Sequence, residues 1–265
     1  VYLNVDSNKL TGTIPSTTGL LKSLTSLNMC GNLFNGTIPS SLGQLSLLTI
    51  LNIHYNKLTG TIPSALGLLT TLTEFYMFTN NLYGTIPSAL GLLSQLVSLN
   101  IFDNKLSGTI PSTFGLLKAL TYLSIGANSL YGTIPSSLGL LSLLSILDIH
   151  YNNLTGTIPL ALYSLASIGI LSIDNNKLTG TIPTTLGQLS SLTTFYPDDN
   201  SLTGTVPYQL CLDKKLVYLA FDYNNLACYA DCLTTVKYRF YGEIVNCGKG
   251  KKSIYSRKFI FICNK

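Results

Sequence analysis

Charged residues are scarce in this sequence. Only 10% of its 265 residues are Asp, Glu, Lys or Arg, whereas an average soluble domain has about 25%. The surface must therefore consist mainly of Thr, Ser, Asn, Gly and Tyr, which suits neutral, hydroxylated ligands. The net charge of +5 is uneven, because residues 1–210 hold six basic and seven acidic residues and residues 211–265 hold ten and four. A nucleic-acid-binding protein would carry a basic stripe along its length, so we predict no nucleic-acid partner.

Long apolar runs are also missing. Every Leu-rich stretch is interrupted by Ser, Thr or Gly within a few residues, and a membrane-spanning helix needs about 18 or more uncharged residues. We therefore expect no membrane span. The hydrophobic content of 46% still provides ample material for a buried core and argues against disorder.

One repeat of 24 residues dominates the chain. The motif Gly-Thr-Ile-Pro recurs without insertion from Gly12 to Gly180 and ends as Gly-Thr-Val-Pro at Gly204. Each repeat also carries a variant of Leu-x-Leu-x-x-Asn-x-Leu, as in residues 51–58. A fixed period of about 20 to 29 residues with this pattern is the signature of a leucine-rich repeat.

Each repeat predicts one turn of a solenoid. Alternate residues of Leu-x-Leu point inward from a short parallel strand. The Asn that follows, which recurs every 24 residues from Asn8 to Asn224 and is called the ladder asparagine here, must satisfy its amide against the backbone of the neighbouring turn. A second short strand with Leu58 and Ile62 inward follows, and residues 64–69 return as a short helical or 3-10 turn. Turns stacked about 4.8 Å apart would align like-numbered residues in rows.

We therefore predict an α/β fold, with about ten leucine-rich-repeat turns over residues 1–226 and a Cys-containing cap with a basic tail over residues 227–265. Four of the six cysteines lie within 37 residues at the end of the repeats, and no Cys-x-x-Cys pair suggests zinc. This clustering predicts disulfides, an oxidising compartment and a secreted or cell-surface protein. The four residues are Cys211, Cys228, Cys232 and Cys247, and pairing the first with the second and the third with the fourth is one of three connectivities.

The segment Leu-Thr-Gly-Thr-Ile-Pro-Ser-x-Leu-Gly-x-Leu resembles the plant-type leucine-rich repeat of receptor-kinase ectodomains and polygalacturonase-inhibiting proteins, over about residues 1–226. The resemblance implies an extracellular, curved, right-handed solenoid. It also implies that the first strand of each turn lines a concave ligand-binding face and that the second strand flanks it. The sequence departs from plant receptors because it has no paired-Cys amino-terminal cap and no kinase.

Two rows of residues vary on the expected concave face. The first concave row lies two residues before each ladder asparagine, and the second concave row lies one residue before it. With the strand tyrosines Tyr76, Tyr122 and Tyr196, these rows offer aromatic faces suited to a protein or glycan; an ordinary solvated sheet is the alternative. The candidates are His54, Tyr55, Tyr76, Phe78, Phe102, Asp103, Tyr122, His150, Tyr151, Asp174, Asp198 and Tyr223.

Neither a metal nor catalysis is favoured on this face. Carboxylates at 174, 198, 199 and 222 lie on three successive turns, but Ca²⁺ needs six or more oxygen ligands, so a hydrated acidic patch is preferred. His54 and His150 are about 19 Å apart, too far to share a metal, and are expected to be ordinary surface imidazoles. Cys30 near His54 lacks an orienting acid. We predict no catalytic residues, no cofactor and no enzymatic activity.

The most regular surface is a row of threonines on the second strand. A flat array of Thr side chains is similar to the ice-binding faces of repetitive antifreeze proteins, so an ice surface is the alternative partner, although β-branched Thr also simply suits an exposed strand. A shorter parallel row of Thr is interrupted by Asn35, Tyr83, Ser107 and Tyr131. The threonine row comprises Thr13, Thr37, Thr61, Thr85, Thr109, Thr133, Thr157, Thr181 and Thr205.

Two further features bear on the surface. Asn35 and Asn153 begin N-glycosylation patterns, which is consistent with secretion. The tail after Lys249 is rich in basic and apolar residues and is expected to cover the last turn. A structural or adhesive component that assembles end to end is a third functional class that the low charge allows.

Overall fold

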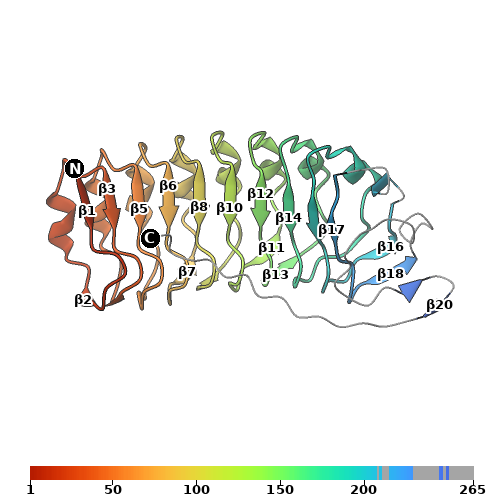
Figure 1. Cartoon of the computed structure of the whole chain (residues 1–265), viewed down its shortest axis with the longest axis horizontal. Coiled ribbons are helices and arrows are strands. Elements are labelled where there is room, and N and C mark those ends of the chain that lie inside the picture. Colours follow the sequence, from red (N-terminus) through yellow and green to blue (C-terminus); the bar gives the residue numbers. More distant parts are fainter. Residues whose placement is uncertain (208, 211–214, 229–244, 247–248, 251–265) are drawn as a thin grey trace.

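The computed structural model describes residues 1–207, 209–210, 215–228, 245–246 and 249–250. The repeats stack along one axis into an elongated solenoid, with a long sheet on one side and short helices on the other (Figure 1). The predicted leucine-rich-repeat architecture is therefore confirmed.

The long sheet has ten strands in sequence order, paired parallel throughout. Partner residues lie 24 apart, as in Leu3 with Leu27 and Leu27 with Leu51. This register confirms that like-numbered residues form rows on this sheet. The strands are β1 (Tyr2–Asn4), β3 (Ser26–Asn28), β5 (Ile50–Asn52), β6 (Glu74–Tyr76), β8 (Ser98–Asn100), β10 (Tyr122–Ser124), β12 (Ile146–Asp148), β14 (Ile170–Ser172), β15 (Thr194–Tyr196) and β17 (Tyr218–Leu219).

The second strands form parallel pairs rather than one continuous sheet. Their partners lie 22 residues apart, as in Thr133 with Thr155, and isolated bridges join Thr37 to Thr59 and Thr181 to Thr203. Like-numbered residues are therefore displaced by two positions along the strand from turn to turn, so the rows on these strands run obliquely to the strand direction. The pairs are β2 (Thr11–Thr13) with β4 (Leu33–Asn35), β7 (Tyr83–Thr85) with β9 (Lys105–Ser107), β11 (Tyr131–Thr133) with β13 (Asn153–Thr155), and β16 (Thr203–Thr205) with β18 (Asn225–Cys228).

The returning segments are 3-10 helices, one of the two forms expected for them, and no α-helix occurs in the part of the chain that the structure describes. Each helix follows a proline in extended conformation and ends after five residues, a length suited to 3-10 rather than α geometry. The helices are η1 (Ser16–Leu20), η2 (Ser40–Gln44), η3 (Ser64–Leu68), η4 (Ser88–Leu92), η5 (Ser112–Leu116), η6 (Ser136–Leu140), η7 (Leu160–Ser164) and η8 (Thr184–Gln188).

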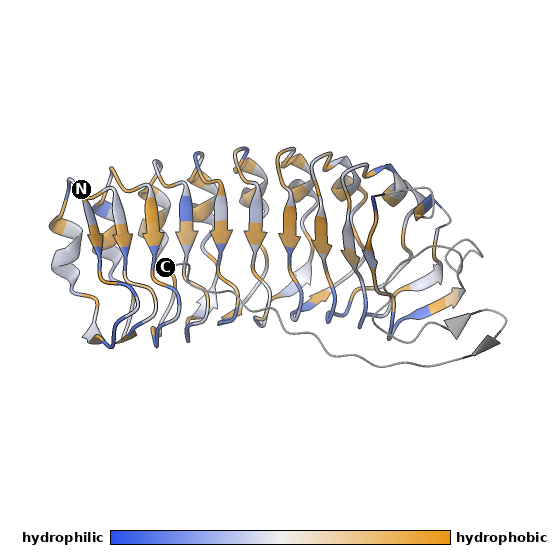
Figure 2. Ribbon diagram, in the orientation of Figure 1, coloured by the Kyte–Doolittle hydropathy of each residue, from blue (hydrophilic) through white to orange (hydrophobic). Residues whose placement is uncertain are grey.

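The core is one continuous column of Leu and Ile side chains supplied by every turn, including the fully buried Leu58 and nearly buried Ile62 that the pattern placed inward. Figure 2 shows this as hydrophobic colour along the long-sheet strands and hydrophilic colour in the loops that follow them. Ladder asparagines tie the turns together. Asn80 Nδ2 donates to the carbonyls of Ile53 and Met77 at 3.1 Å, and its Oδ1 accepts the Leu58 N–H at 3.0 Å.

The predicted cap falls largely outside the described residues. Cys211, Cys232 and Cys247 lie outside them, and only the backbone of Cys228 is described, within β18. The disulfide pairings therefore remain predictions. A short antiparallel pair, β19 (Val245–Asn246) with β20 (Lys249–Gly250), follows the repeats. Among the helices that the structure describes, none has the length and apolar character needed to cross a bilayer.

Candidate binding surfaces

The two concave rows differ sharply in exposure. In the first row, His54 and His150 are only 6% and 7% exposed, so the expectation of surface imidazoles is wrong. Phe78 and Asp174 in the same row are buried as well. The rings of His54 and Phe78 stack on each other across adjacent turns. They form a layer beneath the exposed residues rather than the outermost contact surface.

The second concave row protrudes because its backbone is left-handed. Its non-glycine residues have φ between 47° and 53°, a conformation that L residues adopt only where the surrounding structure enforces it. Tyr151 and Tyr223 are exposed here, Asp103 is exposed, and Tyr55 is half-buried. The structure therefore places the predicted contact residues of this row at the surface.

An aromatic cluster surrounds His54. Its ring stacks on Phe78 with centroids 4.0 Å apart and planes 10° from parallel, and Tyr55 contacts both rings edge-on at 5.3 Å. His54 Nδ1 contacts the side-chain oxygen of Asn52. Burial lowers the pKa of His54 to about 4, so the imidazole is neutral at physiological pH. The cluster is a rigid apolar platform beneath Tyr55.

The equivalent site at His150 contains an acidic residue. His150 Nδ1 pairs with Asp148 Oδ1, and the Ser124 hydroxyl donates to Asp148 Oδ2 at 2.9 Å. Burial and, secondly, the Asp148 charge raise the pKa of Tyr122 to about 12. Ser124 donates to the carboxylate and not to the imidazole, so the three groups lack the nucleophile-to-base order of a catalytic triad. The cluster holds His150 in one orientation.

The end of the first row near β14 to β17 is acidic. Asp174 accepts hydrogen bonds from the Ser172 hydroxyl at 2.7 Å and from Asn175 Nδ2 at 3.1 Å, while Asp198 and Asp222 follow on the next turns. Within the residues that the structure describes, no group of three or more His, Cys, Asp or Glu is placed to hold a metal ion. The arrangement gives no support to a calcium site.

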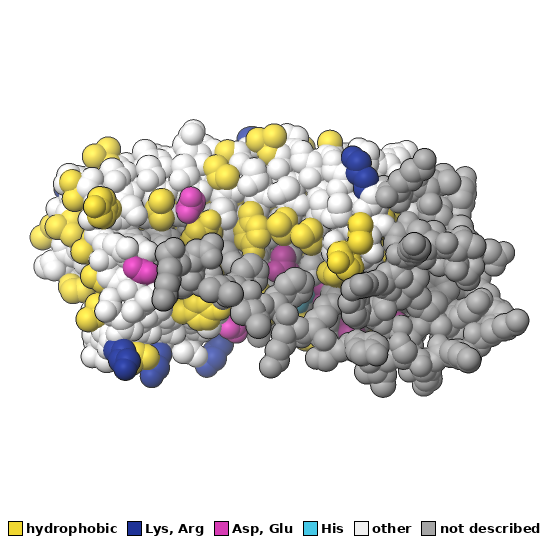
Figure 3. Space-filling model, viewed as in Figure 1, with side chains coloured by type: hydrophobic (Ala, Val, Ile, Leu, Met, Phe, Trp, Pro, Cys, Tyr) yellow, Lys and Arg dark blue, Asp and Glu magenta, His cyan; other side chains and the backbone are white. Residues whose placement is uncertain are grey.

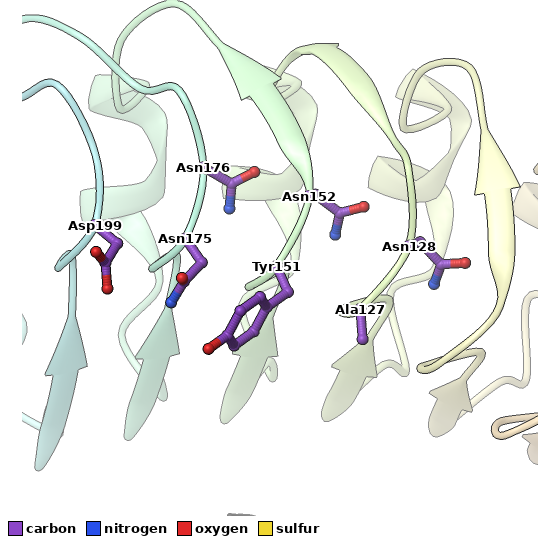
Figure 4. A pocket seen from close by; sticks show the side chains of 7 residues that line it. All are labelled: Ala127, Asn128, Tyr151, Asn152, Asn175, Asn176 and Asp199. Atoms are coloured by element: carbon purple, nitrogen blue, oxygen red, sulfur yellow. The ribbon is translucent and has the colours of Figure 1, made fainter. Parts of the chain in front are cut away.

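A shallow groove of about 580 Å³ runs beside Tyr151 (Figure 4). The ladder asparagines along one wall are already bonded to the backbone, as Asn152 shows with Nδ2 donating to the Ile125 carbonyl at 3.2 Å. The side chains left to contact a ligand are those of the second concave row. The lining residues are Ala127, Asn128, Tyr151, Asn152, Asn175, Asn176 and Asp199. Ala127, Asn175 and Asp199 were not among the sequence-based candidates, and their position one residue before a ladder asparagine was the available signal.

The face of the long sheet mixes apolar, polar and acidic side chains (Figure 3). Tyr76, Tyr122 and Tyr196 are all half-buried on this sheet. The pKa of Tyr76 is raised, chiefly by burial. The three strand tyrosines therefore lie on the long sheet, next to the concave rows.

The threonine row lies on a different side of the solenoid, on the second strands. All nine of its residues are exposed. Their methyl groups pack over the glycine of the next turn: a β carbon on Gly132, whose φ is 78°, would lie 2.9 Å from Thr109 Cγ2. In the shorter parallel row, the hydroxyls of Thr59 and Thr155 donate to glycine carbonyls of the preceding turn at 3.3 Å. The two predicted glycosylation residues also lie here, with Asn35 exposed and Asn153 half-buried.

Comparisons with known proteins agree with this architecture. The leucine-rich repeat family model matches residues 23–45, 47–69, 95–117, 143–165 and 167–189. The chain is 31% identical to the plant peptide hormone receptor RGFR1, solved in complex with RGF2, over 91% of the chain and 39% of the receptor, with a TM-score of 0.87. The chain is a plant-type leucine-rich repeat protein. It is 35% identical to the Arabidopsis receptor kinase HAESA, solved with the peptide hormone IDA and the co-receptor SERK1, over 92% of the chain and 41% of the receptor, with a TM-score of 0.86.

Another similar structure belongs to a protein with a different activity. A plant ice-binding protein is 27% identical over 86% of this chain and 73% of its own length, with a TM-score of 0.73. A comparison with curated protein sequences finds no match. The repeat protein described here spans about two fifths of the length of the two receptors, so their partners do not transfer directly to it.

Proposed function

We propose that this leucine-rich repeat protein is a non-enzymatic extracellular binding module that recognises an extended protein segment on its concave side, chiefly through the second concave row. The proposal rests on where the sequence varies from turn to turn. The framework positions repeat almost unchanged in every turn, whereas the second concave row changes from turn to turn, with Tyr55, Asp103, Tyr151 and Asp199 at equivalent positions. Variation restricted to one side of a rigid repeat is what selective recognition requires.

The physical character of the rows favours a particular kind of segment. The exposed Tyr151 ring stands beside the groove with the small Ala127 on one side and Asn175 on the other. Such a ring, held by a rigid backbone, is a strong anchor for apolar side chains. The acidic residues two turns further on favour Lys or Arg in the part of the partner that lies there. The partner is therefore an extended segment with apolar residues followed by basic ones.

The similar structures support a protein partner. RGFR1 and HAESA were each solved with a peptide hormone, and the chain superposes on both over more than nine tenths of its own length. Because the chain covers only about two fifths of either receptor, the identity of the segment that it binds is part of the proposal.

The test is selection from a displayed library of extended peptides, followed by affinity measurement on two matched variants. Tyr151→Ala removes a tyrosine that is 58% exposed in the second concave row, and Tyr131→Ala removes one that is 55% exposed on the second strands. We expect Tyr151→Ala to weaken binding about tenfold or more, as loss of an anchor residue does, and Tyr131→Ala to leave it unchanged. Equal effects of both variants, or selected peptides without basic residues, would contradict the proposal.

Ice binding is the second candidate, because the nine threonines of the row are all exposed and a plant ice-binding protein is among the similar structures. It would use the threonine row and not the concave rows. Thermal hysteresis and ice-crystal shape test it directly. Shaped crystals that become disc-like in a Thr109→Tyr and Thr133→Tyr double variant would support ice binding, and discs from the unmodified protein would end it.

A further inference from the structure

A second groove, of about 790 Å³, runs along the solenoid between the threonine row and the start of the 3-10 helices. Residues of four successive turns line it, and two of these turns contribute the same full set: a threonine of the row, the following Ile and Pro, and the first two residues of the helix. None of the lining residues is charged. They are Ser88, Thr109, Ile110, Pro111, Ser112, Thr113, Thr133, Ile134, Pro135, Ser136, Ser137, Thr157 and Pro159.

The groove combines hydroxyl groups with apolar C–H surface. The Thr113 hydroxyl donates to the Ser88 carbonyl and the Ser137 hydroxyl to the Ser112 carbonyl, each at 2.7 Å, so both oxygens remain acceptors. A hydroxyl can donate one hydrogen bond and accept two, so each of these two hydroxyls can still accept hydrogen bonds from a ligand. The proline rings and threonine methyls supply the apolar part. A charged ligand would find no counter-charge here, whereas a neutral polyhydroxylated ligand would find both kinds of contact.

Two tyrosines project from the same face. Tyr83 and Tyr131 occupy the position two residues before Thr85 and Thr133, on the same outward side of their strands, and are 54% and 55% exposed. They lie two turns apart, on β7 and β11. Their rings interrupt what would otherwise be a flat array of threonines. Exposed aromatic rings have a negative face that attracts C–H groups. The apolar faces of sugar rings present such C–H groups.

We propose that this face binds a linear, uncharged, β-linked glycan that lies along the solenoid axis. Because two successive turns line the groove with the same kinds of residue, a ligand that itself repeats along its length would meet the same contacts at both turns. In an extended β-linked chain alternate sugars present the same face, so sugars with the same face outward would stack on the two tyrosines. The hydroxyls of the helix starts and of the threonine row would bond the ring substituents. This site is separate from the concave rows and does not depend on the proposed peptide binding.

The test is binding of cellohexaose and of insoluble cellulose to the purified full chain, with the α-linked glucan dextran as the ligand control. We expect binding to the β-linked probes and none to dextran. The Tyr83→Thr and Tyr131→Thr double variant should lose binding at least tenfold, whereas Tyr151→Ala, on the concave side, should bind as the unmodified protein does. Both sets of substitutions are at exposed positions, and circular dichroism would verify that the variants are folded.

The same double variant separates the glycan from ice. Replacing both tyrosines by Thr lengthens the threonine array, so an ice-binding face would gain thermal hysteresis as glycan binding is lost. Absence of binding to both β-linked probes, or binding that survives the double variant, would overturn the proposal. Binding that is lost in Tyr151→Ala as well would also overturn it, by placing the glycan on the concave rows.

Discussion

Phe102 and His150 lie two turns apart, yet their ring centroids are separated by only 5.4 Å. The contact exists because the intervening turn carries Gly126 at the equivalent position. A β carbon built on Gly126 would lie 2.9 Å from His150 Nδ1 and 3.0 Å from the His150 carbonyl oxygen. The imidazole therefore occupies the space that a side chain at position 126 would take. At the strand spacing alone, the rings of Phe102 and His150 would lie about 10 Å apart.

Gly126→Ala should break this contact. The added methyl would push His150 away from Phe102, and overpacking of this kind costs about 1 to 3 kcal/mol in the free energy of unfolding. Loss of nuclear Overhauser effects between the two rings, together with urea unfolding, would measure both consequences. A second substitution, His150→Ser, should relieve the clash and give a double variant more stable than the sum of the single effects predicts. Strict additivity of the two substitutions would show that the methyl does not meet the imidazole.

The ladder asparagines should differ strongly according to their place in the stack. Asn152 is buried and bonded through Oδ1 to the Leu130 N–H at 2.9 Å and through Nδ2 to the Ile125 carbonyl of the preceding turn. Asn8 is exposed and bonds only within its own turn. Asn152→Ala should lower the free energy of unfolding by about 3 kcal/mol, because buried partners are left unsatisfied, and Asn8→Ala by less than about 1 kcal/mol. Equal losses in urea unfolding would contradict the proposed tie between turns.

The solenoid could be predicted from the sequence because each position in the repeat has the same structural role in every turn. Leu27 and Leu51 fill equivalent core sites, and Asn80 satisfies the backbone in the way that its burial demands. A period of 24 without insertions then fixes the register of the long sheet. These features follow from patterns that recur in the sequence, so they can be recognised from the sequence alone.

The binding surfaces were less predictable, because they depend on contacts between different residues in neighbouring turns. Exposure of His54 depends on Phe78 in the next turn, which stacks on it, and exposure of His150 depends on the missing side chain at Gly126. The register of 22 between second strands, as between Thr133 and Thr155, arises from the path of the backbone through the turn between the two strands. A period of 24 in the sequence does not reveal that displacement.

Glycine at the end of the 3-10 helices sets how closely the helices approach. A β carbon on Gly139 would lie 2.2 Å from the carbonyl oxygen of Ala161 in the next turn, whereas at Gly169 the nearest atom is 3.6 Å away. Gly139→Ala must therefore separate two turns and should lower the free energy of unfolding by about 1 to 3 kcal/mol. Gly169→Ala provides the matched control and should be neutral or slightly stabilising, since it restricts the unfolded chain. A tolerated Gly139→Ala in urea unfolding would show that helix spacing is not fixed by contact.

His54 should make the protein less stable in acid. Its pKa in the folded protein is about 4, below the ordinary value of 6.5, because burial disfavours the charged ring. Between these values the unfolded chain binds a proton that the folded protein does not, so the free energy of unfolding falls as the pH is lowered from about 6.5 to 4. His54→Phe keeps a ring on Phe78 and removes this contribution, so its stability should depend less on pH over that window, while Tyr131→Phe should retain the full dependence. Titration of the two histidines by NMR would check the cause, and a His54 pKa near 6.5 would refute it.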